Sequence, residues 1–144
     1  MKIAECMSTD VRVAADDNTL QSAAQAMGDI DAGFLPVIDN GHLIGIVTDR
    51  DIAIRGVAAG LPPESGVRDV MSEDVLYCFD DQDSREVLAN MSELQVRRLP
   101  VVNRDKRLVG IVSLSDLADE GDSAPAGEAL EDIALPSSRH SQSV

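Results

Sequence analysis

The sequence predicts a mixed α/β (α+β) fold made of two β-α-β-β-α units. The first observation behind this prediction is an internal repeat: Leu35-Pro36-Val37 recurs as Leu99-Pro100-Val101, and Gly45-Ile46-Val47-Thr48 recurs as Gly110-Ile111-Val112-Ser113. The second is the spacing between copies, which is 64 residues before the turn at Gly41 and 65 after it, so one hairpin turn holds an inserted residue. Both indicate duplication of a whole unit. We expect the copies to pack across a pseudo-two-fold axis, with a ligand cleft at their seam.

Each copy opens with an extended stretch and a helix. A short lead-in helix is expected to end near Met7 and Met71, followed by extended stretches at 11–14 and 75–78. The acidic turns at 16–18 and 80–83 offer helix N-caps. Apolar residues at helical spacing then predict helices at 19–29 and 84–94.

A hairpin and a closing helix complete each copy. The first hairpin joins strands 34–38 and 43–48 through a turn containing Asn40-Gly41, which is a strong two-residue turn signal. The second joins strands 99–102 and 108–113. These strands are β-branched and almost continuously apolar, so both of their faces should be buried. The closing helices are predicted at 50–59 and 115–119.

The repeat sets the expected domain boundaries. We assign residues 1–59 to the first copy, 60–66 to a linker, 67–120 to the second copy and 121–144 to a flexible, acidic, Ser/Pro-rich tail. Aromatic residues make up only 2% of the 144 residues, so aliphatic side chains must form the core. We expect each of the following to be buried: Leu35, Val37, Ile46, Val47, Leu99, Val101, Ile111 and Val112.

Charge and hydropathy exclude several classes of partner. The net charge of −14 argues against nucleic acid or an anionic membrane surface, because phosphate polymers are bound by positive surfaces. Five of the twelve basic residues fall between 97 and 107, a local patch that suits a small anion. No apolar run approaches the roughly 18 residues that span a bilayer, and no signal peptide is visible. We therefore predict a cytoplasmic protein with no membrane partner.

The motif h-P-h-h, a turn, then G-h-h-(Thr/Ser)-x-x-Asp and a helix resembles the cystathionine-β-synthase (CBS) domain. Two copies in register, covering residues 3–119, resemble a CBS pair, or Bateman module, of the short stand-alone type. The resemblance implies a regulatory module that binds an adenosine nucleotide or S-adenosylmethionine between the copies. No obligatory cofactor is expected, and AMP, ADP or ATP is the expected ligand, sensed on behalf of an unknown protein partner.

Residue chemistry fits that implied site. The carboxylates of Asp51 and Asp116 can accept hydrogen bonds from both ribose hydroxyls, with Thr48 and Ser113 beside them. Free N–H groups at the helix starts would favour a phosphate.

By the family pattern, each site is completed by segments of the other copy. The implied set for Ser113 and Asp116 is Asp10, Val11, Arg12, Ala32 and Gly33, and for Thr48 and Asp51 it is Val75, Leu76, Tyr77, Val96 and Arg97. Arg50, Arg97 and Arg98 are candidate phosphate ligands, which favours a nucleotide over S-adenosylmethionine.

Other interpretations stay open. Asp51 and Asp116 could act only on the helix dipole, Arg50 could be a surface residue, and Arg97 and Arg98 could border a dimer. The alternative functions are a ligand-free interaction or stress-response protein with vestigial sites, or a binder of S-adenosylmethionine or NAD. No catalytic constellation, metal-ligand spacing or P-loop appears, so we expect no enzyme and no metal.

Two further expectations concern assembly and redox chemistry. A homodimer is predicted, formed through the small-residue helix with Ala23, Ala24, Ala26 and Met27 and an apolar surface from Val87, Leu88 and Met91. Cys6 and Cys78 occupy different positions of the repeat, matching Val70 and Ala14. They could be reduced, partly buried thiols or a redox-responsive bridge.

Overall fold

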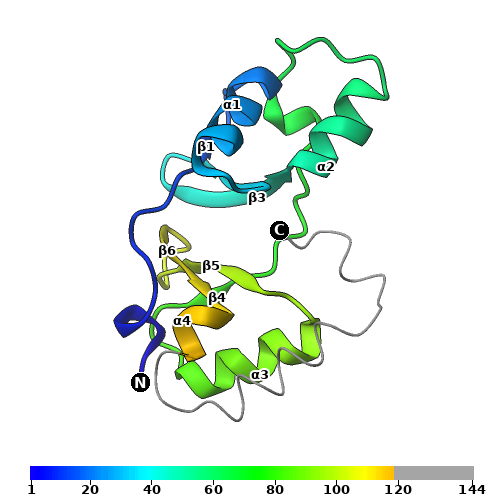
Figure 1. Ribbon diagram of the computed structural model, residues 1–144. Helices are drawn as coiled ribbons and strands as arrows, with labels where there is room; N and C mark the ends of the chain where they lie inside the picture. The colour runs from blue at the N-terminus through cyan, green and yellow to red at the C-terminus, as the bar shows by residue number, and fades with distance from the viewer. Residues whose placement is uncertain (119–144) are drawn as a thin grey trace. The chain divides into compact units, whose positions relative to one another are not determined.

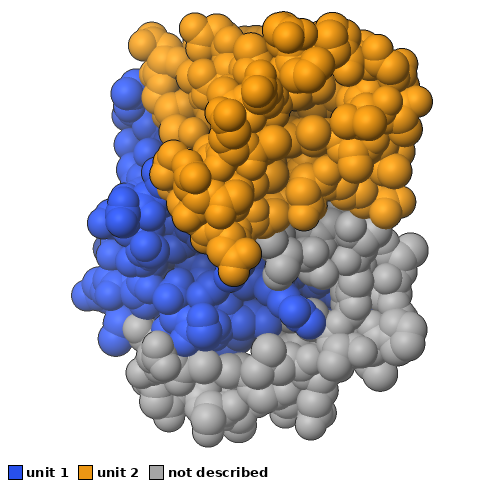
Figure 2. Space-filling model, turned by 45° about the horizontal axis from the view of Figure 1, so that its top comes forward, with its two compact units in different colours: residues 1–11, 76–143 blue, residues 12–75, 144 orange. Residues whose placement is uncertain are grey.

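The computed structural model describes residues 1–118, and the predicted tail at 121–144 lies outside the described residues. The contacts divide the chain into two compact units (Figure 2). Among the described residues, unit 1 comprises 1–11 and 76–118, and unit 2 comprises 12–75. Each unit is described by itself. The predicted pseudo-two-fold packing of the two copies stays a prediction.

Unit 2 contains the helix and hairpin of the first copy (Figure 1). Its three-stranded sheet has the order β1-β2-β3, with β1 parallel to β2 and β2 antiparallel to β3. Its elements are β1 (Ala14–Ala15), α1 (Leu20–Ile30), β2 (Phe34–Asp39), β3 (His42–Thr48), α2 (Asp49–Asp51), η2 (Ile52–Val57) and η3 (Val67–Asp69).

Unit 1 repeats this plan with the second copy. Its sheet has the order β4-β5-β6 with the same parallel and antiparallel pairings, and α3 and α4 lie on the same side of it (Figure 1). Its elements are η1 (Ile3–Glu5), β4 (Cys78–Phe79), α3 (Ser84–Leu94), β5 (Arg98–Val102), β6 (Leu108–Ser113) and α4 (Leu114–Ala118). The predicted mixed α/β fold of two related units is confirmed.

The helices predicted at 19–29 and 84–94 are present as α1 and α3, with one difference at their caps. The closing helix predicted at 50–59 is α2 followed by η2, which ends at Val57. Asp83 caps α3 as expected, because its side chain accepts a hydrogen bond from the backbone N–H of Arg85. The acidic turn before α1 does not cap that helix. Thr19 caps it instead, because its side chain accepts a hydrogen bond from Ser22 N at 3.1 Å. The side chain of Asn18 accepts from Ala15 N, within the turn that precedes the helix. The hydroxyl of Thr19, at the N-cap position, therefore caps α1 in place of the acidic residues that precede it.

The hairpin turns differ as the spacing predicts. Asn40 and Gly41 both have positive φ (53° and 86°), the conformation that a two-residue hairpin turn requires. The longer second turn places Lys106 at φ 62° and closes through a hydrogen bond from Lys106 N to Asn103 O at 3.0 Å. The inserted residue is thus absorbed in the turn, and the strand register is the same in both units.

Each unit has its own aliphatic core between the helices and one face of the sheet. In unit 2 the core is formed by Ala14, Leu20, Ala23, Met27, Leu35, Val37, Val47, Val67, Val70 and Met71. In unit 1 it is formed by Ile3, Cys78, Val87, Leu88, Met91, Leu99, Val101, Val112, Leu114 and Leu117. Burial of this aliphatic surface is the main stabilising term in each unit.

Burial on both strand faces is confirmed only for the central strands. Residues 34–37 of β2 and 99–102 of β5 are buried without interruption, whereas β3 and β6 mix buried and half-buried residues. Ile46 and Ile111 are half-buried, so two of the eight side chains expected in the core are not fully enclosed. The physical reason is position: β2 and β5 are middle strands, and β3 and β6 lie at the sheet edge.

The lead-in segments are exchanged between the copies. Ile3 precedes the first copy in sequence but is fully buried in the core of unit 1, and Val67 precedes the second copy but is fully buried in unit 2. Backbone bridges join Ser8 to Ile111 in unit 1 and, at the matching positions, Ser72 to Ile46 in unit 2. The boundaries drawn from the repeat describe the order along the chain, and as domain boundaries they stay a prediction.

Each lead-in segment passes close over the edge strand of its unit, and the strand has a glycine at that point: Gly45 in β3 and Gly110 in β6. A Cβ on Gly45 would lie 2.7 Å from Met71 Sδ and 2.9 Å from Ser72 O, and one on Gly110 would lie 2.6 Å from Met7 Sδ and 2.7 Å from Ser8 O. Both separations are too short for any side chain. The motif glycine is therefore present because a second backbone passes over it.

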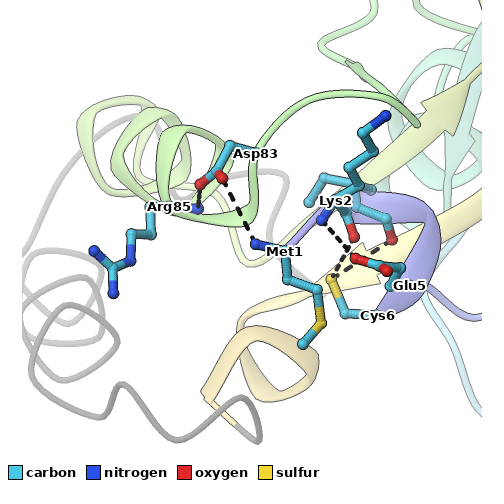
Figure 3. Close-up of polar contacts among 7 residues, drawn as sticks. Met1, Lys2, Glu5, Cys6, Asp83 and Arg85 are labelled. Atoms are coloured by element: carbon cyan, nitrogen blue, oxygen red, sulfur yellow. Dashed lines mark hydrogen bonds and ion pairs between the residues drawn. The ribbon is translucent and has the colours of Figure 1, made fainter.

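The N-terminal segment is also tied to α3 (Figure 3). The α-amino group of Met1 lies 3.6 Å from Asp83 Oδ2, and Ser84 N donates to Met1 O at 2.7 Å. The hydrogen bond from Arg85 N and the charge of the amino group together lower the pKa of Asp83. The cap of α3 is thus shared between its own helix and the exchanged segment.

The predicted dimer surface is wrong in part. Val87, Leu88 and Met91 were expected to offer apolar surface, but they are 0%, 5% and 0% exposed and fill the core of unit 1. Ala23 and Met27 are likewise buried in unit 2. The helical spacing that suggested an outward face is the spacing of the inward face.

Within residues 1–118, no helix is long and apolar enough to cross a membrane.

Candidate functional site

The motif residues of the first copy form a reciprocal pair at the junction of β3 and α2. Thr48 Oγ1 accepts from Asp51 N at 3.0 Å, and Asp51 Oδ2 accepts from Thr48 N at 3.0 Å. This is a capping box, in which two backbone donors at the helix start are satisfied by each other's side chains. Asp51 is therefore a helix-capping carboxylate, and its role toward a ligand stays a prediction.

The second copy builds the same pair. Ser113 Oγ accepts from Asp116 N at 3.2 Å, and Asp116 Oδ2 accepts from Ser113 N at 2.9 Å. The two pairs occupy matching places in the two units, each directly after the edge strand. The repeat has thus preserved a geometry as well as a sequence motif.

In each pair, only one oxygen of the aspartate carboxylate, Oδ2, takes part in the cap. Among residues 1–118, Oδ1 of Asp51 and Oδ1 of Asp116 accept no hydrogen bond, and both side chains are half-buried. The hydroxyl hydrogen of Thr48 is not needed by the cap, because Oγ1 acts there as the acceptor. Each pair therefore retains an oriented anionic acceptor beside a hydroxyl.

The expectation of free backbone N–H groups is wrong for the first copy. Asp49 N donates to Gly33 O at 2.8 Å, Arg50 N to Asp49 Oδ1 at 2.8 Å, and Asp51 N to Thr48 Oγ1. All three amides of α2 are thus satisfied within the unit. A phosphate at this helix start would have to be bound by side chains instead.

In the second copy one amide differs. Leu114 N donates to Arg97 O at 3.0 Å, the counterpart of the bond between Asp49 and Gly33. Ser115 N has no acceptor in the part of the chain that the structure describes, because Leu114 stands where Asp49 supplies one in the first copy. Ser115 Oγ lies 2.8 Å from Ser113 Oγ.

The candidate phosphate ligands are exposed, and within residues 1–118 they are unpaired. The side chains of Arg50, Arg97 and Arg98 make no ion pair with any residue in 1–118. The backbone of Arg97 is fixed by Leu114, and Arg98 lies opposite Ser113 in the sheet register. Two exposed cations therefore flank the Ser113–Asp116 pair, whereas the first copy has Gly33 and Phe34 at those places.

The basic patch predicted at 97–107 is smaller than expected. Arg104 forms a bidentate ion pair with Asp81 (2.8 and 2.7 Å) and lies 4.0 Å above the Phe79 ring. The hydrogen bond from Arg104 lowers the pKa of Asp81 and raises that of Arg104. Lys106 lies 5.1 Å above the ring of Tyr77. These two cations pack on aromatic rings, which leaves Arg97, Arg98 and Arg107 of the five basic residues outside that cluster.

Tyr77 belongs to that cluster as well. Its ring packs edge-on against Phe79, with the centroids 5.7 Å apart. Leu76, beside it, is 46% exposed. Sequence reasoning missed this cluster because cation–aromatic pairs depend on the hairpin register, which brings Arg104 and Lys106 back over β4.

The remaining predicted site residues divide between the units. Asp10 and Val11 belong to unit 1 with Ser113 and Asp116. Val75 belongs to unit 2 with Thr48 and Asp51.

Other predicted residues contact their own copy. Arg12 forms an ion pair with Asp29 at 3.7 Å, and the backbone N–H groups of Ala32 and Val96 close the ends of α1 and α3. The predicted completion of each site by the other copy stays a prediction.

Among residues 1–118, no group of three or more His, Cys, Asp or Glu side chains could hold a metal ion.

Comparison with known proteins gives this arrangement a family. The CBS domain model matches the chain twice, at residues 3–56 and 67–123. Hypoxic response protein 1 of Mycobacterium tuberculosis is 42% identical over 116 residues, covering 79% of this chain and 80% of that protein.

Solved structures agree. The crystal structure of Hypoxic Response Protein I with two coordinated zinc ions has a TM-score of 0.72 and 37% identity, covering 83% of this chain and 98% of that one. The CBS domain pair of protein MJ0100, in complex with 5-methylthioadenosine and S-adenosyl-L-methionine, has a TM-score of 0.67 and 25% identity, with coverage of 84% and 95%. The chain therefore belongs to the CBS domain family, as a tandem pair.

Proposed function

We propose that this protein is a non-catalytic regulatory module that binds an adenosine nucleotide, AMP, ADP or ATP, and acts on a separate protein partner. The observation that carries the proposal is the duplicated Thr/Ser–Asp pair, in which the cap leaves one carboxylate oxygen of each aspartate unused. A ribose presents two adjacent hydroxyls, which are the donors that such a carboxylate accepts. The adenosine compounds bound by the MJ0100 pair support the ligand class.

A nucleotide is preferred over S-adenosylmethionine because of charge. Arg97 and Arg98 are exposed, unpaired among residues 1–118 and adjacent to the Ser113–Asp116 pair. Guanidinium groups bind phosphate oxygens with bidentate hydrogen bonds, whereas a sulfonium gains nothing from them. We therefore propose the second copy as the nucleotide site with the stronger preference for phosphate.

Calorimetry with purified protein tests the ribose contact. Asp116→Asn keeps an oxygen that can cap α4 but removes the charge, so nucleotide affinity should fall about 10- to 100-fold while the fold survives. Asp49→Asn is the matched control, since Asp49 also caps a backbone amide at a helix start but lies outside both pairs. Unchanged affinity in Asp51→Asn and Asp116→Asn alike would place the site elsewhere.

A second titration tests the phosphate contact. Arg97→Gln should weaken AMP and ATP but leave adenosine unaffected, because adenosine has no phosphate. Arg104→Gln is the matched control, since that guanidinium is already held by Asp81. Absence of binding by any adenosine compound to the wild type would favour a ligand-free interaction protein with vestigial sites.

A homodimer remains part of the proposal, on a different surface from the one the sequence suggested. The exposed large apolar side chains of η2 are Ile54 and Val57, 55% and 72% exposed. Two copies meeting through one shared helical face would form an isologous interface.

A further inference from the structure

The two cysteines of the chain meet at one core cluster of unit 1, although they occupy different positions of the repeat. Cys6 matches Val70 and Cys78 matches Ala14, so the sequence alone gives no reason to pair them. The exchange of lead-in segments changes this. It brings Cys6 together with Cys78 in unit 1 and Val70 together with Ala14 in unit 2.

Unit 2 shows what the matching positions look like when both are apolar. Val70 and Ala14 are 0% and 1% exposed and belong to one core cluster. Val70 directly follows η3, as Cys6 directly follows η1. Ala14 begins β1, as Cys78 begins β4, and each pairs with the matching residue of the central strand. The cysteine pair therefore replaces a packed Val–Ala pair.

Backbone hydrogen bonds hold the two cysteine segments side by side. Ala4 N donates to Asp80 O at 3.0 Å, and Ile3 N donates to Gln82 O at 2.9 Å. Cys78 is 3% exposed within the core cluster, and Cys6 is half-buried and packs against the same cluster. No disulfide joins the two cysteines in this structure. Cys6 Sγ donates to Ile3 O at 3.5 Å and to Lys2 O at 3.7 Å.

The two thiols are unequal in access, and the pKa of the Cys78 thiol is raised. Burial, reinforced by the neighbouring charges of Cys6 and Asp80, raises the pKa of Cys78 to about 12. Cys78 is therefore a protonated, shielded thiol at neutral pH. Cys6 is the thiol that a small reagent can reach first.

We propose that Cys6 and Cys78 form a reversible intramolecular disulfide when the protein meets a low-molecular-weight disulfide such as oxidised glutathione. The thiolate of Cys6 attacks one sulfur of the reagent, the reagent's S–S bond breaks, and one glutathione thiolate leaves. The thiolate of Cys78, having given its proton to solvent, then attacks the sulfur of Cys6 and releases the second glutathione. The protein gives up two electrons and two protons, which convert the reagent into two thiols.

The bridge would act on the strand that leads into the second copy's motif. The segment carrying Cys6 continues to Ser8, whose N–H donates to Ile111 O at 2.8 Å and whose carbonyl accepts from Ile111 N at 2.9 Å. Ile111 precedes Ser113 by two residues on β6. A covalent tie between Cys6 and β4 therefore stabilises this pairing in unit 1 alone, since the matched pair in unit 2 has no sulfur.

The experiment treats the full chain with oxidised glutathione and maps its peptides without reduction. The expected product is one peptide pair joining Cys6 to Cys78 in a chain that stays monomeric on a denaturing, non-reducing gel. Its thermal midpoint should rise by about 5 °C or more, because the bridge closes a long loop in the unfolded chain. Exchange of the Ser8 and Ile111 amides should slow.

Two controls make the result specific. Cys6→Val and Cys78→Ala each introduce the residue of unit 2, so both variants should fold and neither should gain stability with oxidant. The amides of Ile46 and Ser72, paired in the same way in unit 2, should exchange at an unchanged rate. Glutathione left on either cysteine as a stable adduct, bridges between chains, or full retention of both thiols in the native wild type would each overturn the proposal.

Discussion

Gly45 and Gly110 determine whether each lead-in segment can cross its edge strand. Gly45→Ala places a methyl group 2.9 Å from the carbonyl oxygen of Ser72, a backbone atom that cannot move without losing its pairing with Ile46. We expect chemical denaturation to show a loss of about 1–3 kcal/mol in the free energy of unfolding. Gly110→Ala should behave alike, because its methyl would lie 2.7 Å from Ser8 O.

Gly28→Ala is the matched control for these substitutions. Gly28 lies in α1, and a Cβ there meets nothing within 4 Å. Alanine should therefore stabilise the helix by about 0.5–1 kcal/mol. If all three variants lost stability equally, close approach of the backbone would not be the reason for the motif glycines.

The buried thiol of Cys78 leads to a second prediction at the residue scale, on how the stability of the reduced protein depends on pH. The pKa of the Cys78 thiol is about 12 in the folded protein, against an ordinary value of 9.0. Between these values the unfolded chain loses a proton that the folded chain keeps. The free energy of unfolding should therefore be highest below pH 9 and fall, from this group, by at most about 1.4 kcal/mol per pH unit above it. Cys78→Ala should show a shallower decline in urea unfolding at pH 8–11; equal slopes would contradict the assignment.

The exchanged lead-in segments can be tested as elements. Ile3 is fully buried in unit 1, so Ile3→Ala should remove about 2–5 kcal/mol of stability and lower amide protection in α3 and β6. Val67→Ala, at the matching position, should instead lower protection in α1 and β3. Amide hydrogen exchange followed by mass spectrometry measures the change in protection in both variants. Loss of protection in unit 2 on substituting Ile3 would mean that the segments are not exchanged.

The elements also show what the sequence could predict. The helices near 19–29 and 84–94 and both hairpins were predictable, because helical spacing and Asn40-Gly41 are local signals. The exchange of the lead-in segments could not be predicted, because Met7 and Met71 are equivalent in the repeat. No local signal indicates which edge strand each of them crosses. Isolated glycines inside two strands were the available signal that some backbone approaches closely.

The two aspartates of the candidate site could be predicted from the sequence, whereas the charged residues around them could be predicted only in part. Asp51 and Asp116 follow from the repeat, and their capping role follows from spacing alone. The loss of Arg104 and Lys106 from the basic patch could not be foreseen, since it depends on which side of the hairpin faces β4. For the same reason the inward direction of Val87 was mistaken for an outward one.

At the scale of the whole molecule, net charge limits how two copies can meet. Each chain carries a net charge of −14, so two like surfaces repel unless the contact is apolar or locally basic. The outer face of η2 meets this condition. Ile54 and Val57 are exposed there, and Arg50, whose side chain makes no ion pair with any residue in 1–118, precedes them on α2. This face is therefore the surface on which we expect the homodimer to form.

Val57→Asp tests that assembly. The substitution adds a charge to each side of an isologous contact, so it acts twice and leaves two carboxylates facing each other without water. Light scattering at tens of micromolar should show a dimer for the wild type and a monomer for Val57→Asp. Leu76→Asp, an equal change at an exposed apolar residue of unit 1, should leave the dimer intact. A monomeric wild type would refute the homodimer, whereas dissociation by Leu76→Asp alone would move the interface from η2 to unit 1.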